Sequence, residues 1–107
     1  MTHWPESTVV RVDPDIADLI PRYLDNRRQD IGDLRAAVTA RDLATIRSIA
    51  HQLRGSGGGY GLDAISDFGN KLGEAARAAD LASVSVWIDE LERYVTQVEV
   101  VPWDSPS

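Results

Sequence analysis

The fold is decided by the stretch Ala50-His51-Gln52-Leu53-Arg54-Gly55-Ser56-Gly57-Gly58-Gly59-Tyr60-Gly61. It holds one of the two histidines of the chain and five of its eight glycines. As a loop, such a stretch is ordinary. As a helix it is costly, because each glycine in a helix interior loses about 1 kcal/mol relative to alanine. A chain that accepts this cost gains room that side chains would fill, and we predict that the room gives access to His51.

The residues before the glycines predict a helix. Asp42 is a favourable N-cap residue, and an apolar series opens directly after it. Apolar or small residues then recur at steps of three and four, which is the period of one helix face. We therefore expect the helix to continue into the glycine-rich stretch, with one stripe facing a core. The stripe consists of Leu43, Ile46, Ala50, Leu53, Gly57 and Tyr60.

His51 lies one position off this stripe, so a helix would turn it outward. Its neighbours on the helix surface are the residues three and four positions away. These are Arg47 on one side, and Arg54 and Gly55 on the other, with Gly58 one turn further along. The spacing predicts an exposed histidine with cations nearby and bare backbone beside it, which suits close approach by another protein.

These residues resemble the motif of the histidine-containing phosphotransfer (HPt) domain. In that motif an aliphatic residue follows the histidine at the second position, Lys or Arg at the third, Gly at the fourth, and a small residue one turn later. The corresponding residues are His51, Leu53, Arg54, Gly55 and Gly58. The resemblance implies a four-helix bundle with an outward histidine on its second helix. It also implies a phosphoryl carrier between receiver-domain aspartates, or from a hybrid histidine kinase.

The first helical region is interrupted. Asp13 is a favourable N-cap and Pro14 a favourable first helical residue. Helical apolar spacing then continues, but Pro21 removes one backbone donor and disfavours the helical conformation for Ile20. We expect a short helix to about Ile20 and a longer one to about Ala40, or one helix that is kinked at Pro21.

Two further amphipathic helices follow the histidine helix. The first begins near Leu62 or Asp63, and the second is capped by Asp80 and ends before Pro102. No segment alternates with a period of two for long enough to predict a strand. Four amphipathic segments joined by short turns predict an all-α fold, an antiparallel four-helix bundle with a short extra N-terminal helix or a kink.

Length and composition limit the function. The 107 residues form one domain, with the bundle over roughly 14–98 and loosely packed or flexible ends at 1–8 and 100–107. The net charge of −6 argues against nucleic acid and anionic membranes as partners. Cysteine is absent, which excludes disulfides and thiolate metal sites. No apolar signal or spanning segment is present, so we expect a cytoplasmic protein. We also expect a monomer, and Met1 favours a freestanding protein.

Phosphotransfer chemistry gives each motif residue a role. A histidine nucleophile attacks through a neutral ring nitrogen and needs an uncluttered line of approach. Gly55 and Gly58 would supply this clearance. Arg54 would form charge-assisted hydrogen bonds to the phosphoryl oxygens, and Arg47 would assist from the preceding turn. The other ring nitrogen needs a partner that orients the imidazole.

The resemblance places that orienting partner on the third bundle helix, where a glutamine or glutamate is common. This sequence has Gly73 at that position, which departs from the family. Asn70 and Glu74 on the same helix are the candidate substitutes. The resemblance further implies that the receiver brings Mg²⁺ and the acidic residues that catalyse transfer. We therefore expect no cofactor, no metal site and no independent turnover in this chain.

Three hypotheses remain from the sequence. The first is a phosphoryl carrier with His51 as acceptor. The second is a module of the same fold that docks receiver domains or kinases without carrying phosphate. The third is a helical adaptor whose glycines allow tight helix packing, which predicts that the glycines are buried. A nucleotide loop is excluded, since Leu62-Asp63 follows the last glycine where a P-loop has lysine and a hydroxyl residue. His3 is interpreted as an ordinary surface residue.

Overall fold

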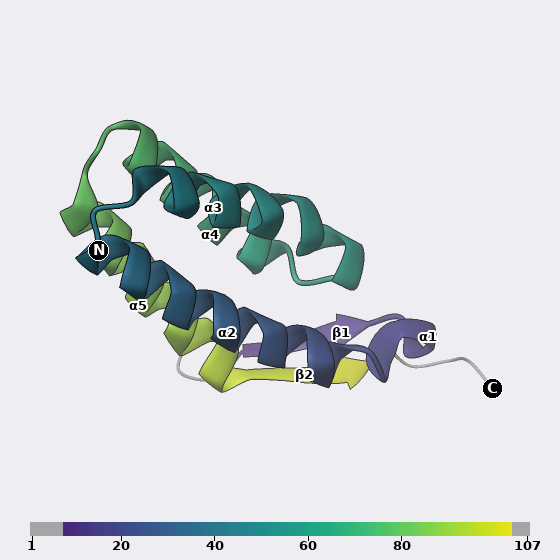
Figure 1. Cartoon of the computed structure of the whole chain (residues 1–107). Helices are drawn as coiled ribbons and strands as arrows, with labels where there is room; N and C mark the ends of the chain where they lie inside the picture. Colours follow the sequence, from purple (N-terminus) through teal and green to yellow (C-terminus); the bar gives the residue numbers. More distant parts are fainter. Residues whose placement is uncertain (1–7, 104–107) are drawn as a thin grey trace.

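A computed structural model describes residues 8–103 of the chain. Four long helices dominate the structure, and two short strands lie beside the N-terminal half of the first of them (Figure 1). The elements in chain order are β1 (Thr8–Val12), α1 (Pro14–Ala17), α2 (Ile20–Thr39), α3 (Leu43–Ser56), the 3₁₀ turn η1 (Gly58–Tyr60), α4 (Asp63–Arg77), α5 (Leu81–Gln97) and β2 (Val98–Pro102).

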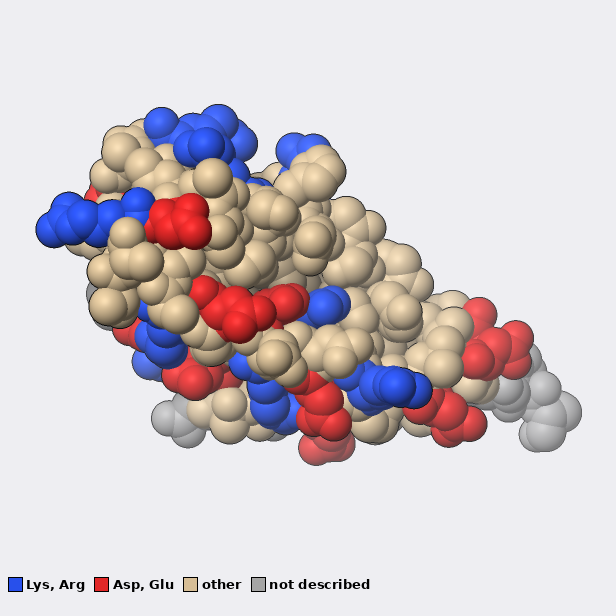
Figure 2. Space-filling view, viewed as in Figure 1, with Lys and Arg blue, Asp and Glu red and all other residues tan. Residues whose placement is uncertain are grey.

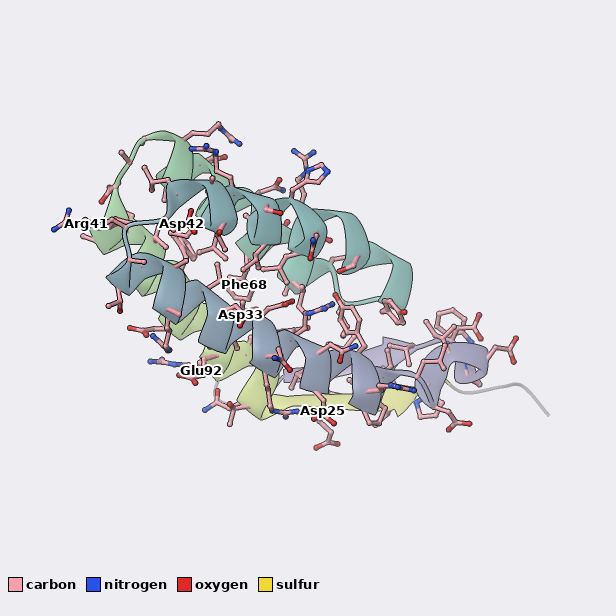
Figure 3. The ribbon with its side chains drawn as sticks, in the orientation of Figure 1. Asp25, Asp33, Arg41, Asp42, Phe68 and Glu92 are labelled. Carbon is pink, nitrogen blue, oxygen red and sulfur yellow. The ribbon has the colours of Figure 1, made fainter. Side chains whose placement is uncertain are left out.

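The long helices form the predicted antiparallel bundle. The α3 helix packs along α4, and α2 packs along α5, while α2–α3 and α4–α5 contacts join the two pairs (Figure 1). Phe68 lies between the helices near the middle of the bundle (Figure 3). The prediction of an all-α four-helix bundle is therefore confirmed. The largest fully buried side chains are Phe68, Ile20, Leu34, Ile46, Leu53, Leu62, Ile65, Leu72, Ile88, Leu91, Val12 and Val84.

Aspartate caps begin the two helices that follow the tight turns. The Asp42 side chain accepts a hydrogen bond from the backbone N–H of Thr45 at 3.1 Å, and Asp80 accepts one from Ser83 at 3.1 Å. Each also accepts a hydrogen bond from the hydroxyl of the same partner, and these bonds hold the pKa of both carboxyl groups below the usual value. The caps predicted at Asp42 and Asp80 are thus confirmed, and they set where α3 and α5 begin.

Ala79, in the turn before α5, adopts φ +55°, a left-handed conformation that costs an alanine about 1–2 kcal/mol. We expect Ala79→Gly to raise the free energy of unfolding by about 1 kcal/mol, because glycine adopts this conformation without a steric penalty. Ala78→Gly is the matched control. Because Ala78 has φ −82°, which alanine adopts without strain, this change should lower the free energy of unfolding. Urea unfolding measures both, and equal effects would contradict the strain at Ala79.

The break in the first helical region lies slightly earlier than predicted. The short helix ends at Ala17, and α2 begins at Ile20, which places Pro21 in its first turn. A proline there removes no intrahelical hydrogen bond, because the first N–H groups of a helix have no partner within it. Two separate helices therefore form, as expected, but Pro21 starts the second one instead of bending it.

The histidine helix ends earlier than the apolar spacing suggested. The α3 helix stops at Ser56, and the chain continues through a 3₁₀ turn, Gly58–Tyr60. Gly61 closes the turn with φ +74°, which favours glycine. The prediction that a helix continues to Tyr60 was wrong, because consecutive glycines tighten the chain into a turn that leads directly into α4.

The prediction that the chain has no strand was also wrong. β1 and β2 pair in parallel, with Thr8 opposite Val98 and Val12 opposite Pro102. The backbone N–H of Trp103 extends the pairing by donating to Val12 O at 2.8 Å. The last helix ends at Gln97, and residues 98–102 are a strand instead of a helix end and a loose tail. Residues 1–7 and 104–107, the rest of the predicted loose ends with His3, lie outside the described residues.

Candidate functional site

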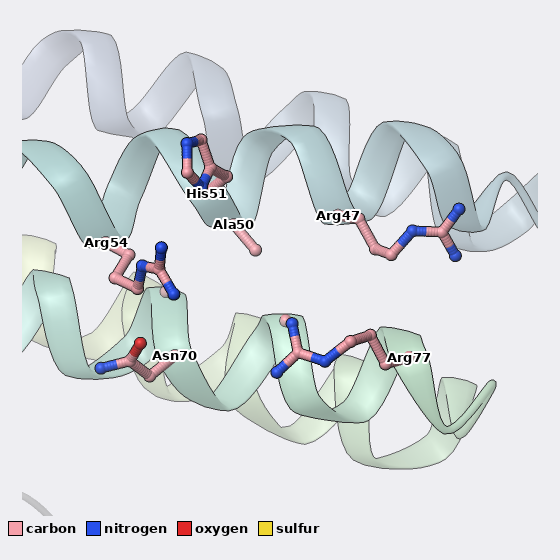
Figure 4. Close-up of a pocket in the computed structure, with 8 residues that line it drawn as sticks. Arg47, Ala50, His51, Arg54, Asn70 and Arg77 are labelled. Carbon is pink, nitrogen blue, oxygen red and sulfur yellow. The ribbon is translucent and has the colours of Figure 1, made fainter.

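His51 lies on the outer surface of α3. The residues beside it on the chain show why, since Ala50 and Leu53 are buried in the core and the helix turns His51 away from them. Figure 4 shows the imidazole standing away from the gap between α3 and α4. The predicted exposure of this histidine is confirmed.

A small hollow lies between α3 and α4 beside the imidazole. Its volume is about 40 Å³. Two predicted arginines, Arg47 and Arg54, contribute to its wall, as does Asn70 from α4. The complete lining is Arg47, Ala50, His51, Arg54, Gly69, Asn70, Gly73 and Arg77.

The predicted cations around His51 differ in direction. Arg54 extends from α3 across to α4, where Asn70 lies opposite it, whereas Arg47 extends along α3 away from His51 (Figure 4). Within residues 8–103 neither arginine takes part in an ion pair, and no side chain forms a hydrogen bond to the imidazole. Arg54 is therefore the better placed of the two for a group bound to His51.

The two candidate orienting residues are separated by the structure. Asn70 lines the hollow with His51. Glu74 instead lines a groove between α4 and α5, where the Lys71 ammonium lies 6.0 Å from the centre of the Trp87 ring. Of the two candidates, only Asn70 lines the hollow that His51 also lines, so we favour Asn70 over Glu74 as the orienting residue. This role stays a prediction.

Arg77 is a residue of this hollow that sequence reasoning missed. A Cβ built on Gly73 would lie 3.4 Å from Nη1 of Arg77, so the guanidinium packs directly against this glycine. Figure 4 shows the Arg77 side chain lying along α4. The spacing of four residues between Gly73 and Arg77 places both on one helix face, and this was the available signal. The departure at Gly73 thus brings a further cation into the hollow.

The glycines fall into two groups. Gly55 is exposed with no atom within 4 Å of a Cβ built on it, and Gly58 is exposed with only a carboxylate oxygen of Asp63 at 3.6 Å. Both glycines are thus exposed, and their role in leaving room for a partner stays a prediction. Gly57 and Gly69 are buried, and a Cβ on either would lie less than 3 Å from backbone atoms. The helix-packing hypothesis therefore explains the buried glycines but not Gly55 or Gly58.

The end of α3 is held from both sides. The Tyr23 hydroxyl of α2 is hydrogen-bonded to Ser56 Oγ at 2.8 Å, and the Tyr23 ring stacks on Tyr60 with 4.2 Å between ring centres. From the α4 side, Ser66 Oγ accepts a hydrogen bond from the Gly58 N–H at 3.1 Å. These contacts give the glycine-rich turn a defined position next to His51.

The described part of the chain contains neither a metal-binding cluster nor a membrane-spanning helix. Residues 8–103 contain no cluster of three or more His, Cys, Asp or Glu side chains arranged to hold a metal ion. None of the helices in the same range is both long and apolar enough to cross a membrane.

Comparison with known proteins identifies the family. The Hpt domain matches residues 18–100, which covers all four bundle helices and the described site. No curated protein and no solved structure gives a significant match. Hpt domains are histidine phosphotransfer modules of phosphorelay signalling, carriers of phosphoryl groups that interact with receiver domains and kinases. With its bundle, its outward histidine and a match over most of its length, this chain belongs to the Hpt domain family.

Proposed function

We propose that this chain is a phosphorelay carrier that accepts a phosphoryl group on His51 and passes it on. The donors and acceptors are aspartates of receiver domains, and a histidine kinase is a further donor. The observation that supports this most is the exposed imidazole beside a small hollow lined by arginines that form no ion pair with the residues the structure describes. Exposed glycine backbone next to it leaves room for a partner to approach.

The transfer step is a displacement at phosphorus. A neutral ring nitrogen of His51 attacks the aspartyl phosphate in line with the departing carboxylate oxygen. The bond between phosphorus and that oxygen breaks as the bond to nitrogen forms, and the aspartate leaves as a carboxylate. Transfer to the next aspartate reverses these changes.

We propose Arg54 and Arg77 as the arginines that bind the phosphoryl group on His51, because both line the hollow beside it. Arg54 extends across the hollow, and Arg77 lies over Gly73 on its far wall (Figure 4). Guanidinium groups form strong charge-assisted hydrogen bonds to phosphoryl oxygens. Asn70 is the candidate that orients the imidazole. Arg47 would have to turn from its present direction to reach the group, and its assisting role stays a prediction.

The partner completes the catalytic machinery. Mg²⁺ and the acidic residues around the phosphorylated aspartate belong to the receiver, which supplies charge neutralisation at the phosphorus. This chain then contributes the nucleophile, the arginines and an uncluttered docking face. We therefore propose a carrier without independent turnover, bound to each partner through a small, transient interface.

A docking module without phosphate is the alternative function. The exposed Gly55 and Gly58 support docking as well as they support transfer. The experiment that separates the two is phosphotransfer from labelled receiver domains, with Mg²⁺, to the purified protein. Acid-labile label on this chain supports the carrier. Binding of a receiver without transfer of label supports the docking module and would overturn the carrier.

Clearance at Gly55 gives a separate prediction. We expect Gly55→Gln to slow transfer at least about tenfold, since a long side chain would occupy the face that a partner must approach. Stability should rise by about 0.5 kcal/mol, because glutamine has the higher helix propensity and meets no atom within 4 Å of its Cβ. Transfer kinetics and urea unfolding measure the two effects.

Gly32→Gln is the matched control for this change. Gly32 is an exposed helical glycine of α2, and a Cβ there also meets nothing within 4 Å. This control should gain similar stability and keep the transfer rate of the wild type. Equal transfer rates in both variants would contradict a clearance role for Gly55.

A further inference from the structure

The arginines of the bundle form two groups that differ in their partners. On α2, Arg27 pairs with Asp30 at 2.8 Å and Arg28 with Asp25 at 2.7 Å. Arg35 of α2 also pairs with carboxylates of α5, at 3.1 Å and 2.8 Å. The second group forms no ion pair within residues 8–103, and four of its six members belong to the α3–α4 side. These four are Arg41, Arg47, Arg54 and Arg77, and the other two are Arg22 of α2 and Arg93 of α5.

Three of the unpaired arginines lie on one side of His51. Arg41 lies in the turn before α3, Arg47 one turn before His51, and Arg77 ends α4. Because α3 and α4 are antiparallel neighbours, the start of α3 and the end of α4 share one end of the bundle (Figure 1). Figure 2 shows basic side chains gathered over this end, at the upper left. We call Arg41, Arg47 and Arg77 the basic half of the His51 face.

The other side of His51 is different in kind. Gly55, Gly58 and Gly59 are exposed there next to Arg54, and we call these three residues the glycine half. His51 thus lies between a surface with several cations and one that is mostly bare backbone. The surface around His51 therefore differs between its two ends along α3.

The acidic residues near the basic half offset part of its charge, with two carboxylates against three arginines. Asp42 lies beside Arg41 in the turn before α3 (Figure 3), and Asp80 lies in the turn between α4 and α5. Both carboxylates cap helix N-termini and are occupied by hydrogen bonds from those helices. Glu74 lines the groove between α4 and α5 instead of the hollow.

We propose that the basic half binds an acidic surface of the receiver domain next to its phosphorylated aspartate, and so sets the orientation in which the partner docks. This inference rests on the proposed carrier function and adds the chemistry of the partner surface. Arg47, which extends away from His51 in Figure 4, acts here as a docking residue instead of a phosphoryl ligand. The glycine half then receives the part of the partner that packs closely.

The charge distribution gives a physical reason for this orientation. The chain carries a net charge of −6, so the molecule as a whole repels an acidic partner surface. The basic half attracts an acidic partner surface instead of repelling it. This difference favours encounters in which the acidic surface faces the basic half. Steering of this kind acts on the rate of association and weakens as salt screens the charges.

The test compares Arg47→Gln with Arg93→Gln, which removes the same charge from an exposed residue of α5 outside the His51 face. Both are measured in transfer from a phosphorylated receiver at about 0.1 M and about 1 M salt, where the Debye length falls from about 10 Å to about 3 Å. We expect Arg47→Gln to lower kcat/KM about threefold at low salt, with kcat unchanged and the difference lost at high salt. The double variant Arg41→Gln/Arg47→Gln should lower it about tenfold, and Arg93→Gln should match the wild type.

Other outcomes overturn the proposal in distinguishable ways. A fall in kcat that persists at high salt would make Arg47 a phosphoryl ligand. Equal kcat/KM in all variants would remove the docking role and leave the carrier function intact. If no receiver transfers label, the carrier function fails, and receiver binding is then measured directly. Salt-sensitive binding that weakens in Arg47→Gln but not in Arg93→Gln would still support docking on the basic half. Receiver binding that Arg47→Gln leaves unchanged, or no binding at all, would overturn it.

Discussion

His51→Gln is expected to reduce labelling of this chain by phosphorylated receivers to background. Glutamine has nearly the size and polarity of histidine, but its amide nitrogen is not a nucleophile, so the acceptor atom is lost. The substitution is at an exposed position of α3 and should leave the bundle intact. The measurement is transfer of label from receivers with Mg²⁺, followed by acid treatment, which removes phosphoryl groups from histidine.

Two controls make this result specific. His3→Gln changes the other histidine of the chain and should keep full labelling. Urea unfolding of His51→Gln should match the wild type, which separates loss of the acceptor from loss of the fold. Label that persists in His51→Gln would move the acceptor elsewhere. A variant that loses label but still binds a receiver would show that docking does not need the histidine.

The bundle could be predicted because its signals are local. Apolar residues at steps of three and four define the core face of each helix, and Asp42 and Asp80 define where two helices begin. The outward direction of His51 follows from the same period, since Ala50 and Leu53 are buried on either side of it. These inferences need only residues within two turns of one another.

The strand pair could not be predicted because its signal is long-range. Val10 and Val100 face each other across β1 and β2, ninety positions apart in the chain. Each strand has five residues, which is too short for a period of two to stand out from apolar helix positions. Parallel pairing also lacks the tight turn that announces a hairpin.

The position of the candidate site was predictable, but its packing was not. The spacing of His51 and Arg54 predicted that they share one face of α3, and they do. The cation over Gly73 was missed because it depends on how the Arg77 side chain folds back along α4. Which glycines are exposed and which are buried likewise depends on how closely α4 approaches α3, and no local pattern contains that distance.

The close approach of α3 and α4 depends on Gly69. A Cβ built on this residue would lie 2.5 Å from Arg54 N and 2.7 Å from Ala50 O, which are backbone atoms of α3. Backbone in a packed helix cannot shift without moving its neighbours. Gly69→Ala is therefore expected to push α4 away from α3 and to lower the free energy of unfolding by about 2–3 kcal/mol. Urea unfolding measures the loss.

Gly32→Ala is the matched control, because it makes the same substitution in a helix where the new Cβ meets no atom within 4 Å. It should raise stability by about 0.5–1 kcal/mol, so the two alanine variants should change in opposite directions. Equal stability of the two would show that α3 and α4 do not pack this closely. Because Arg54 and Ala50 flank His51, the displaced helix should also slow phosphotransfer under conditions where Gly69→Ala remains folded. Stability and transfer would then fail together through one contact, since the glycine that brings the helices together also forms the hollow beside the acceptor.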